Sequence, residues 1–230
     1  MFSRIVPVGD SALQVEFENE ISLKVSTEVM SLCAQLEALR IRGISEMLPS
    51  YRALMIHYDP FVTTFSELRN VISGIGTESV GTSAQDGRTV IEIPVIYNGE
   101  DLQEVADYEG ITVEEVIRRH SENPAYIYFL GFSPGLGYAG CEKMTFTVPR
   151  RKSPRQLVPY GTVGIWRNQT AVMPADQPTG WNVIGRTPFK IFDIDRDPAC
   201  LIRSGWWMKF VPVESEEEAG DMPRIYHEDN

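Results

Sequence analysis

Cysteine and histidine are both scarce in this sequence of 230 residues. The three cysteines, Cys33, Cys141 and Cys200, are too few and too widely spaced for a disulfide framework or a zinc site. With only three histidines, the side chain that most often serves as a general acid or base has few candidates. The chain is therefore expected to work in a reducing, cytoplasmic setting.

Long apolar runs are also missing. No segment approaches the roughly 18 apolar residues that span a bilayer, and residues 1–10 lack the basic stretch and apolar core of a secretion signal. We therefore expect neither a membrane span nor a secretion signal. The formal net charge is −11, and the few basic residues accompany no known reader motif, so nucleic acid is not an expected partner.

Much of the negative charge lies at the C-terminus. Residues 214–230 hold seven acidic side chains and one arginine, with no periodic apolar pattern. Such a composition is typical of a disordered, solubilising tail. Without this tail, the rest of the chain has a net charge of only −5.

Residues 131–190 differ from the rest of the chain in charge and composition. They carry eight basic and two acidic side chains, eight of the 18 glycines and seven of the 15 prolines. Glycine and proline at this density specify tight turns and leave backbone N–H groups that can approach a ligand. The segment indicates either a site for an anionic or carbonyl-bearing small molecule or a loop-rich β-domain with a basic surface.

The first part of the chain predicts a small α+β domain over residues 1–87. Apolar residues alternate at 12–17 and recur at helical spacing from Ser22 to Arg40, with Ser22 as the helix cap. Further strands are expected within 48–58 and at 89–96, a second helix at 65–75, and a polar linker at 76–87. The element order would be β-α-β-β-α-β.

The second part, residues 88–213, predicts a β-barrel preceded by two short helices. The helices are expected at Asp101–Glu109 and Thr112–Ser121, where Thr112 and Glu115 match a capping box. From Tyr126 onward, short apolar runs are separated by Gly, Pro and Asn turns. This pattern indicates a closed or nearly closed barrel rather than a parallel α/β sheet.

His120 is the candidate acid–base residue, because it stands shortly before the glycine-rich stretch. A histidine at the C-terminal end of a helix also has a structural use against the helix dipole, and that alternative stays open. His57 lies in an apolar strand and is expected to be a core or sheet residue. His227 lies in the acidic tail and is not expected to take part in chemistry.

The glycine-rich turn Gly131–Tyr138 offers backbone amides and the hydroxyl of Ser133. It lacks the G-x-S-x-G spacing of a nucleophile elbow, the Gly-Lys-Ser/Thr of a P-loop and the βαβ context of a dinucleotide site. The turn can either face a ligand or simply close the barrel. The segment Pro149–Arg155 adds arginines that can grip a carboxylate or phosphate, unless it is only a solvated basic loop or a contact between polypeptides.

Many short motifs, collinear from about residue 8 to residue 213, resemble one protein family. Among them are Val8-Gly-Asp-Ser-Ala-Leu13, Leu48-Pro-Ser-Tyr-Arg52, His57-Tyr-Asp-Pro60, Leu130-Gly-Phe-Ser-Pro-Gly135, Val148-Pro-Arg-Arg151, Gln169-Thr170 and Gly185-Arg-Thr-Pro188. On these residues the chain resembles the family of 5-oxoprolinase B subunits, also known as allophanate hydrolase subunit 1 or sporulation-kinase inhibitor.

The resemblance implies an α+β, ferredoxin-like N-terminal domain followed by an all-β, cyclophilin-like barrel. It also implies one component, inactive alone, of an ATP-dependent amidohydrolase. With a paired C subunit and a third polypeptide, such a complex opens the small cyclic amide 5-oxoproline to glutamate. Two alternatives follow from other family members: a carboxyltransferase or allophanate hydrolase component of urea metabolism, and a regulatory protein that inhibits a histidine kinase.

Site residues are predicted from the basic segment and the matched motifs together. His120 is the expected acid–base group, and no metal ligands are expected. The expected substrate- or anion-binding residues are Gly131, Phe132, Ser133, Gly135, Arg150, Arg151, Arg155, Gln169 and Arg186. Three motif segments depart from the family pattern, so the resemblance leaves the substrate open; they are Gly135-Leu-Gly-Tyr138, Trp166-Arg-Asn168 and Pro178-Thr-Gly-Trp181.

Overall fold

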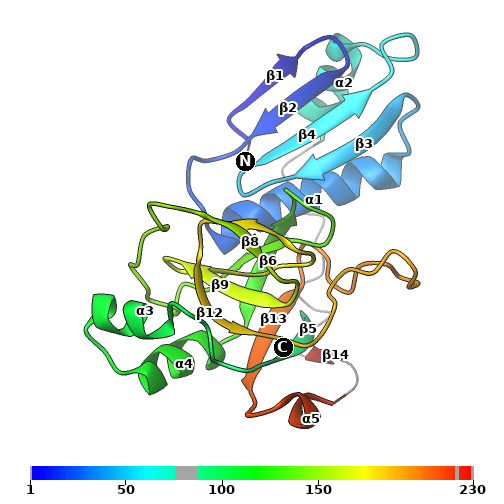
Figure 1. Cartoon of the computed structure of the whole chain (residues 1–230). Helices are drawn as coiled ribbons and strands as arrows, with labels where there is room; N and C mark the ends of the chain where they lie inside the picture. Colours follow the sequence, from blue (N-terminus) through cyan, green and yellow to red (C-terminus); the bar gives the residue numbers. More distant parts are fainter. Residues whose placement is uncertain (1, 76–87, 221–222, 229–230) are drawn as a thin grey trace. The chain divides into compact units, whose positions relative to one another are not determined.

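The computed structural model describes residues 2–75, 88–220 and 223–228 (Figure 1). The chain divides into two compact units, Met1–Asp86 and Gly87–Asn230. The predicted linker at 76–87 and the domain boundary expected after residue 87 lie outside the described residues. None of the described helices is long and apolar enough to cross a membrane.

The first unit is an antiparallel four-stranded sheet with two helices. Alternate residues of its central strands, such as Leu13 and Leu54, are buried in one core with apolar side chains of the helices. Ser22 caps the first helix, as expected, by accepting a hydrogen bond from the Val25 amide. The elements are β1 (Arg4–Val8), β2 (Ala12–Glu16), α1 (Leu23–Leu39), β3 (Ile44–Pro49), β4 (Ala53–Tyr58) and α2 (Phe65–Gly74), with strand order β1-β2-β4-β3.

The predicted element order of this unit is wrong at both ends. A strand absent from the prediction, β1, precedes β2, and its Pro7 is tolerated because β1 lies at the edge of the sheet. The strand expected at 89–96 forms β5 (Arg88–Val95), which belongs to the sheet of the second unit. The observed order is β-β-α-β-β-α. The mixed α and β character is confirmed, and the ferredoxin-like assignment stays a prediction.

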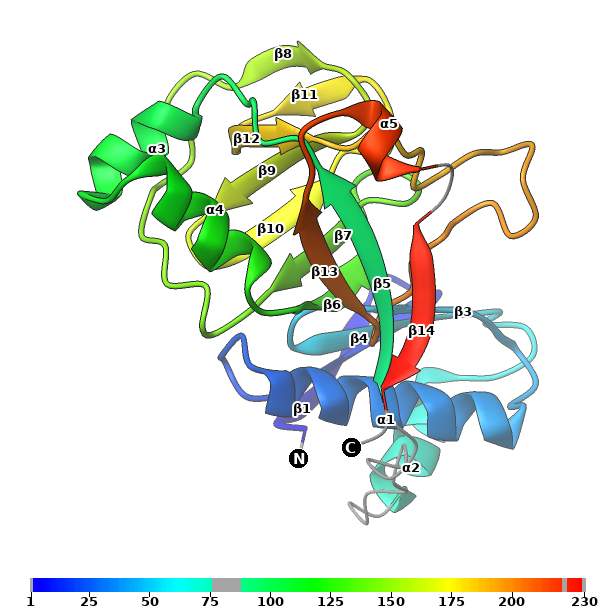
Figure 2. The same ribbon diagram turned by 90° about the horizontal axis from the view of Figure 1, so that it is seen from below.

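The second unit is built on an eight-stranded sheet with α3 (Leu102–Glu109) and α4 (Val113–Ser121) packed beside it (Figure 2). Both helices match their predicted ranges to within one residue. The other strands of the sheet are β6 (Ala125–Leu130), β7 (Gly137–Gly140), β9 (Thr162–Trp166), β10 (Gln169–Val172), β12 (Asn182–Arg186), β13 (Trp207–Pro212) and β14 (Arg224–Glu228), in the order β12-β9-β10-β7-β6-β13-β5-β14. A separate pair is formed by β8 (Arg155–Val158) and β11 (Gln177–Thr179).

The large sheet curls so that strands from its two sides meet. Ile96, directly after β5, forms an antiparallel bridge with Arg186 at the end of β12. The two backbone hydrogen bonds of this bridge are 2.8 and 2.9 Å long. The bridge thus connects β12 with the chain that leaves β5, so the run of neighbouring strands from β12 to β5 closes on itself, as in a barrel. The cyclophilin-like assignment of this barrel stays a prediction.

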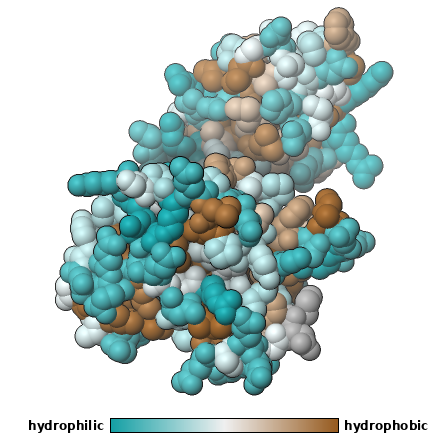
Figure 3. Space-filling model, in the orientation of Figure 1, coloured by the Kyte–Doolittle hydropathy of each residue, from teal (hydrophilic) through white to brown (hydrophobic). Residues whose placement is uncertain are grey.

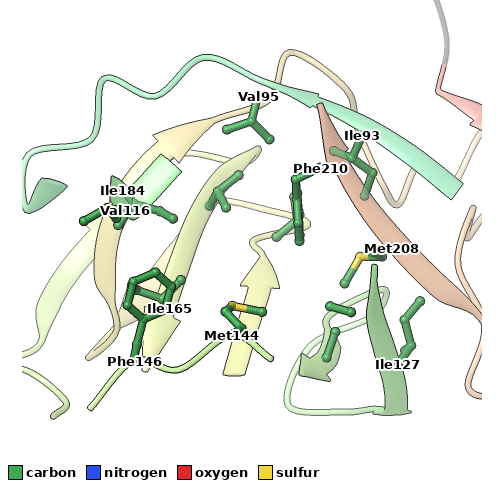
Figure 4. Packing of buried hydrophobic residues seen from close by; sticks show 14 of the residues in the cluster. Ile93, Val95, Val116, Ile127, Met144, Phe146, Ile165, Ile184, Met208 and Phe210 are labelled. Atoms are coloured by element: carbon green, nitrogen blue, oxygen red, sulfur yellow. The ribbon is translucent and has the colours of Figure 1, made fainter. Parts of the chain in front are cut away.

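Apolar side chains fill the interior of the second unit (Figure 4). Ile93 of β5, Phe210 of β13 and Ile165 of β9 are buried there, and Val116 joins them from α4. On the face shown in Figure 3, hydrophobic areas of this unit are separated by hydrophilic side chains. Because the interior is filled, a ligand site is to be sought on the surface of the barrel.

The structure describes a short helix and a strand in the acidic tail, at Glu216–Ala219 and Arg224–Glu228. For these residues the predicted disorder is wrong. β14 pairs with β5, and its Glu228 accepts a hydrogen bond from Arg88 over 2.5 Å. Helix α5 (Glu216–Ala219) brings Glu216 to 2.6 Å from Arg186. These acids meet arginines that are 140 and 30 residues away in the chain, a pairing that composition does not reveal.

Candidate functional site

Two consecutive tight turns connect β6 to β7. In the first, the Ser133 N–H donates to the Gly131 carbonyl over 2.9 Å, which makes a γ-turn centred on Phe132. In the second, the Leu136 N–H donates to the Ser133 carbonyl over 3.1 Å. A Pro-Gly pair occupies its centre, as in a type II turn, and the glycine, Gly135, has the positive φ of 83° that such a turn requires.

Phe132 adopts a strained backbone conformation. Its φ of 70° lies in the left-handed region, which costs a bulky residue on the order of 1–2 kcal/mol. The residue is 73% exposed, so packing does little to offset this strain. Strain of this kind clusters at binding and active sites, which singles out the turn as a candidate site.

The turn leaves two backbone donors unused beside a hollow. Among the described residues, no group accepts a hydrogen bond from the N–H groups of Phe132 and Gly135. Both residues line an open hollow of about 330 Å³ that is formed by residues 130–135. The structure thus brings the predicted residues of this turn together around one hollow. Their amides can bind a carbonyl or carboxylate oxygen of a small molecule.

Ser133 anchors the turn from within the protein. Its hydroxyl donates to Oε1 of Gln177 over 2.6 Å, and Nε2 of this buried glutamine lies 2.9 Å from the sulfur of Met173. The hydroxyl therefore holds the turn in place instead of being activated as a nucleophile. Gln177, in β11, is a site residue that the sequence did not indicate, because its role depends on a contact across 44 residues.

Gln169 does not line this hollow. It is buried at the start of β10, where its backbone lies opposite Gly140 of β7 and Trp166 of β9. The hollow is lined by Leu130, at the end of β6, and by the turn Gly131–Gly135. The structure therefore places Gln169 in the wall of the barrel and not at this hollow.

An aromatic row, defined as Phe129, Tyr138, Trp181 and Trp166, extends from the base of the turn. Phe129 and Tyr138 stack with ring centroids 4.6 Å apart, and the two following steps are 5.9 and 6.2 Å. Burial raises the pKa of Tyr138, and the charge of Arg150 opposes this shift. Arg150 lies over Trp166, 4.1 Å from its centroid. The row therefore leads from the turn to a cationic side chain.

Arg151 and Arg155 bind an internal carboxylate. Both donate to Asp101, which is 2% exposed, through contacts of 2.6 and 2.7 Å. Asp101 also accepts a hydrogen bond from the Val183 amide over 2.7 Å. The structure corrects the prediction that these two arginines bind substrate, because their guanidinium groups already hold the start of α3 against β8 and β12.

The remaining two predicted arginines differ from each other. Arg186 is exposed but forms an ion pair with Glu216 of α5, so its predicted anion-binding role is not available while the tail is folded in this way. Arg150 has no acidic partner among the described residues. Of the predicted set, Arg150 is thus the arginine that remains a candidate for binding an external anion.

His120 is a core residue. Its ring is fully buried, with Nδ1 2.7 Å from the Tyr97 hydroxyl and Nε2 2.8 Å from the Thr170 hydroxyl. The ring also packs on Phe210 at a centroid distance of 4.2 Å. Burial lowers the pKa of His120 to about 3, so the imidazole is neutral at pH 7. The structure corrects the predicted acid–base role, since neither nitrogen can reach a ligand on the surface.

Comparison with known proteins identifies the family. A family model described as "Carboxyltransferase domain, subdomain C and D" matches residues 3–202. The chain is 34% identical to a protein of Bacillus subtilis (strain 168) named as the B subunit of 5-oxoprolinase, over 93% of this chain and 94% of that protein. It is 44% identical to a protein of the same name from Escherichia coli O157:H7, over 91% and 96%.

A solved structure, that of TTHA0988, resembles this chain with a TM-score of 0.78 and 29% sequence identity. The match covers 90% of this chain but only 40% of the solved one, so this chain spans less than half of that larger protein. The curated relatives, in contrast, are matched over nearly their whole length. This chain belongs to the carboxyltransferase domain family of subdomains C and D, together with the proteins named as B subunits of 5-oxoprolinase.

Proposed function

We propose that this chain is one component of an ATP-dependent amidohydrolase that opens 5-oxoproline to glutamate. The observation that carries the proposal is the match to proteins named as the B subunit of 5-oxoprolinase over 94% and 96% of their length. A match of that extent concerns the whole polypeptide and not a shared module. The hollow beside the Gly131–Gly135 turn supports the same interpretation, because it suits a small molecule with a carbonyl group.

The turn would act on the carbonyl of the cyclic amide. Ring opening adds a water-derived oxygen to the carbonyl carbon and breaks the carbon–nitrogen bond, so negative charge develops on the carbonyl oxygen. Fixed N–H donors stabilise such a charge best when they are held in place before the reaction. The amides of Phe132 and Gly135 are donors of this kind, and Ser133 bound to Gln177 keeps the turn in position.

Other polypeptides would supply the rest of the chemistry. His120 is buried and neutral, and no histidine is among the described residues that line the hollow. The turn also lacks the Gly-Lys-Ser/Thr sequence of a P-loop, so we assign ATP to the complex as a co-substrate and not to this hollow. We expect a paired C subunit, and a third polypeptide, to complete the active site, and the isolated chain to be inactive.

The family model is described as a carboxyltransferase domain. This supports one further candidate function, a carboxyltransferase or allophanate hydrolase component of urea metabolism. Its substrate would also present an amide-type carbonyl to the turn, so the geometry of the hollow fits both reactions. The third alternative, inhibition of a histidine kinase, has no feature of the described residues in its favour.

Co-expression of this chain with the other polypeptides of its complex tests the proposal. The purified complex should release glutamate from 5-oxoproline only when ATP is present, and the chain alone should release none. Urea with carboxybiotin serves as the alternative substrate pair. Transfer of the carboxyl group to urea, without turnover of 5-oxoproline, would replace the first proposal by the second.

Phe132 gives a test of whether the backbone of the turn is strained. Phe132→Gly removes both the ring and the strain, whereas Phe132→Ala removes the ring and keeps a side chain at positive φ. We expect Phe132→Gly to be more stable than Phe132→Ala by about 1 kcal/mol in thermal melts. Both variants should lower 5-oxoproline turnover by about tenfold, because both remove the ring of Phe132 from the hollow. Equal stability of the two would mean that this backbone is not strained.

A further inference from the structure

Two arginines share one indole at the far end of the aromatic row. The guanidinium carbon of Arg150 lies 4.1 Å from the centroid of Trp166, and that of Arg167 lies 6.0 Å from the same centroid. Both arginine residues are exposed. Two positive side chains are therefore gathered at one aromatic ring on the surface.

The charges of this pair are not neutralised within the described residues. Neither Arg150 nor Arg167 has an acidic partner there, although the chain holds 32 acidic residues and only 21 lysines and arginines. Another stacked arginine differs in this respect, since Arg88 lies over Trp207 and also binds Glu228. Like charges held close together repel each other, so an external anion at this place would be favoured.

A backbone hydrogen bond joins the two segments that carry these arginines. Arg167 begins the two-residue turn between β9 and β10 and has a φ of 52°, where glycine or asparagine is the favoured residue. Its N–H donates to the carbonyl of Val148 over 3.0 Å, two residues before Arg150. An arginine at this strained position places a second charge beside the first at a cost in stability, as binding sites often do.

We propose that Arg150, Trp166 and Arg167 form a binding site for the oxyanion group of a small molecule. Arg150, the closer of the two, can bind two oxygens of a carboxylate or phosphate with its planar fork of donors. Arg167 adds a second charge and further donors, and the indole provides a flat apolar floor for the rest of the ligand.

The aromatic row connects this oxyanion site to the hollow at the Gly131–Gly135 turn. A substrate with a carboxylate, such as 5-oxoproline, is one source of the oxyanion, and inorganic phosphate released from ATP is another. The choice of the carboxylate rests on the proposed function, whereas the existence of the oxyanion site does not.

Titration of the full chain tests the site. The indole N–H signal of Trp166 is followed by nuclear magnetic resonance while 5-oxoproline, glutamate or inorganic phosphate is added at constant ionic strength, with chloride as the reference. We expect saturable shifts with at least one of these oxyanions. Arg150→Ala should weaken binding by at least about tenfold, since it removes a charge-assisted contact. Arg167→Ala should weaken it several-fold, without lowering the melting temperature.

Arg203→Ala is the matched control. Arg203 is also exposed and lies over an indole, that of Trp206 at 5.7 Å, and no second arginine is seen at that ring among the described residues. It should leave binding unchanged. Equal weakening by Arg203→Ala, or no saturable shift in the wild type beyond that of chloride, would overturn the proposal. If only phosphate bound, the oxyanion site would stand but a carboxylate would not be its ligand. If 5-oxoproline bound here and the assembled complex were inactive, only the proposed function would be contradicted.

Discussion

Replacing Asp101 with alanine should lower the free energy of unfolding of the second unit by about 3 kcal/mol. The substitution removes the carboxylate that Arg151 and Arg155 share, and it leaves the Val183 amide without its acceptor. A buried ion pair that loses one partner is costly because the remaining charges and donors stay desolvated. For a unit of this size the melting temperature should fall by roughly 10 °C, as measured by circular dichroism.

Glu100 and Glu104 provide matched controls, because each contacts one of the same arginines from the surface. Glu104 lies 3.0 Å from Arg151 and Glu100 lies 3.2 Å from Arg155, and their side chains are 69% and 75% exposed. Exposed pairs contribute about 0–1 kcal/mol. If Asp101→Ala destabilised the protein no more than Glu104→Ala, the buried carboxylate would not be the anchor of this cluster.

The effect of Asp101 should depend on pH in a defined direction. Burial alone would raise the pKa of Asp101, but the hydrogen bonds from Arg155 and the Val183 amide, with the charges of both arginines, hold it below its ordinary value of 3.8. A carboxylate whose pKa is lowered by folding stabilises the protein above its unfolded-state pKa and loses this contribution as the pH falls through the folded-state pKa. The difference between wild type and Asp101→Ala should therefore be full at pH 7 and shrink below about pH 4.

This cluster shows where reasoning from the sequence about the basic segment reaches its limit. The sequence predicts that arginines of the segment Pro149–Arg155 bind an anion, and two of them do so. Their anion is Asp101, which lies 50 and 54 residues away and starts a helix that the sequence predicts on local grounds. Local patterns give no information on such a pairing, so an internal carboxylate cannot be told from a substrate.

Elements whose signals are local are predicted well. The two short helices α3 and α4 begin and end within one residue of expectation. The capping box expected at α4 forms only in part: Thr112 accepts from the Glu115 amide, but the Glu115 carboxylate binds Arg118 and Arg119. The features that the sequence does not predict, the strands β1 and β14 and the transfer of β5 to the other sheet, depend on pairing between distant segments.

In the candidate site, too, local features are predicted from the sequence and contacts between distant residues are not. Glycine and proline in the sequence predict a tight turn at residues 131–135, and the structure has two. The strained φ of Phe132 and the contact between Ser133 and Gln177 could not be foreseen, since no residue type at those positions demands them. His120 was expected at the site, but its ring is buried in the core. Its position at a helix end near a motif does not reveal the direction of its side chain.

Replacing Gly135 with alanine should disable the candidate site. An added Cβ would lie 2.6 Å from the Cβ of Phe192, and a φ of 83° is strained for alanine. Since the Cβ of Phe192 is attached directly to the backbone, the turn itself must shift. A misplacement of about 1 Å can cost about a hundredfold in rate. We expect at least such a loss of glutamate release by the assembled complex, together with a destabilisation of about 2–3 kcal/mol.

Gly110 allows the two causes of this effect to be separated. It lies in the same unit with a φ of 65°, but a Cβ added there would meet nothing within 4 Å. Gly110→Ala therefore introduces the strain of positive φ alone, for which we expect about 1 kcal/mol of destabilisation and unchanged turnover. The clash with Phe192 accounts for whatever Gly135→Ala loses beyond this. If the complex with Gly135→Ala turned over 5-oxoproline as fast as the complex with Gly110→Ala, the position of the turn would not matter for the reaction and the site would have to lie elsewhere on the barrel.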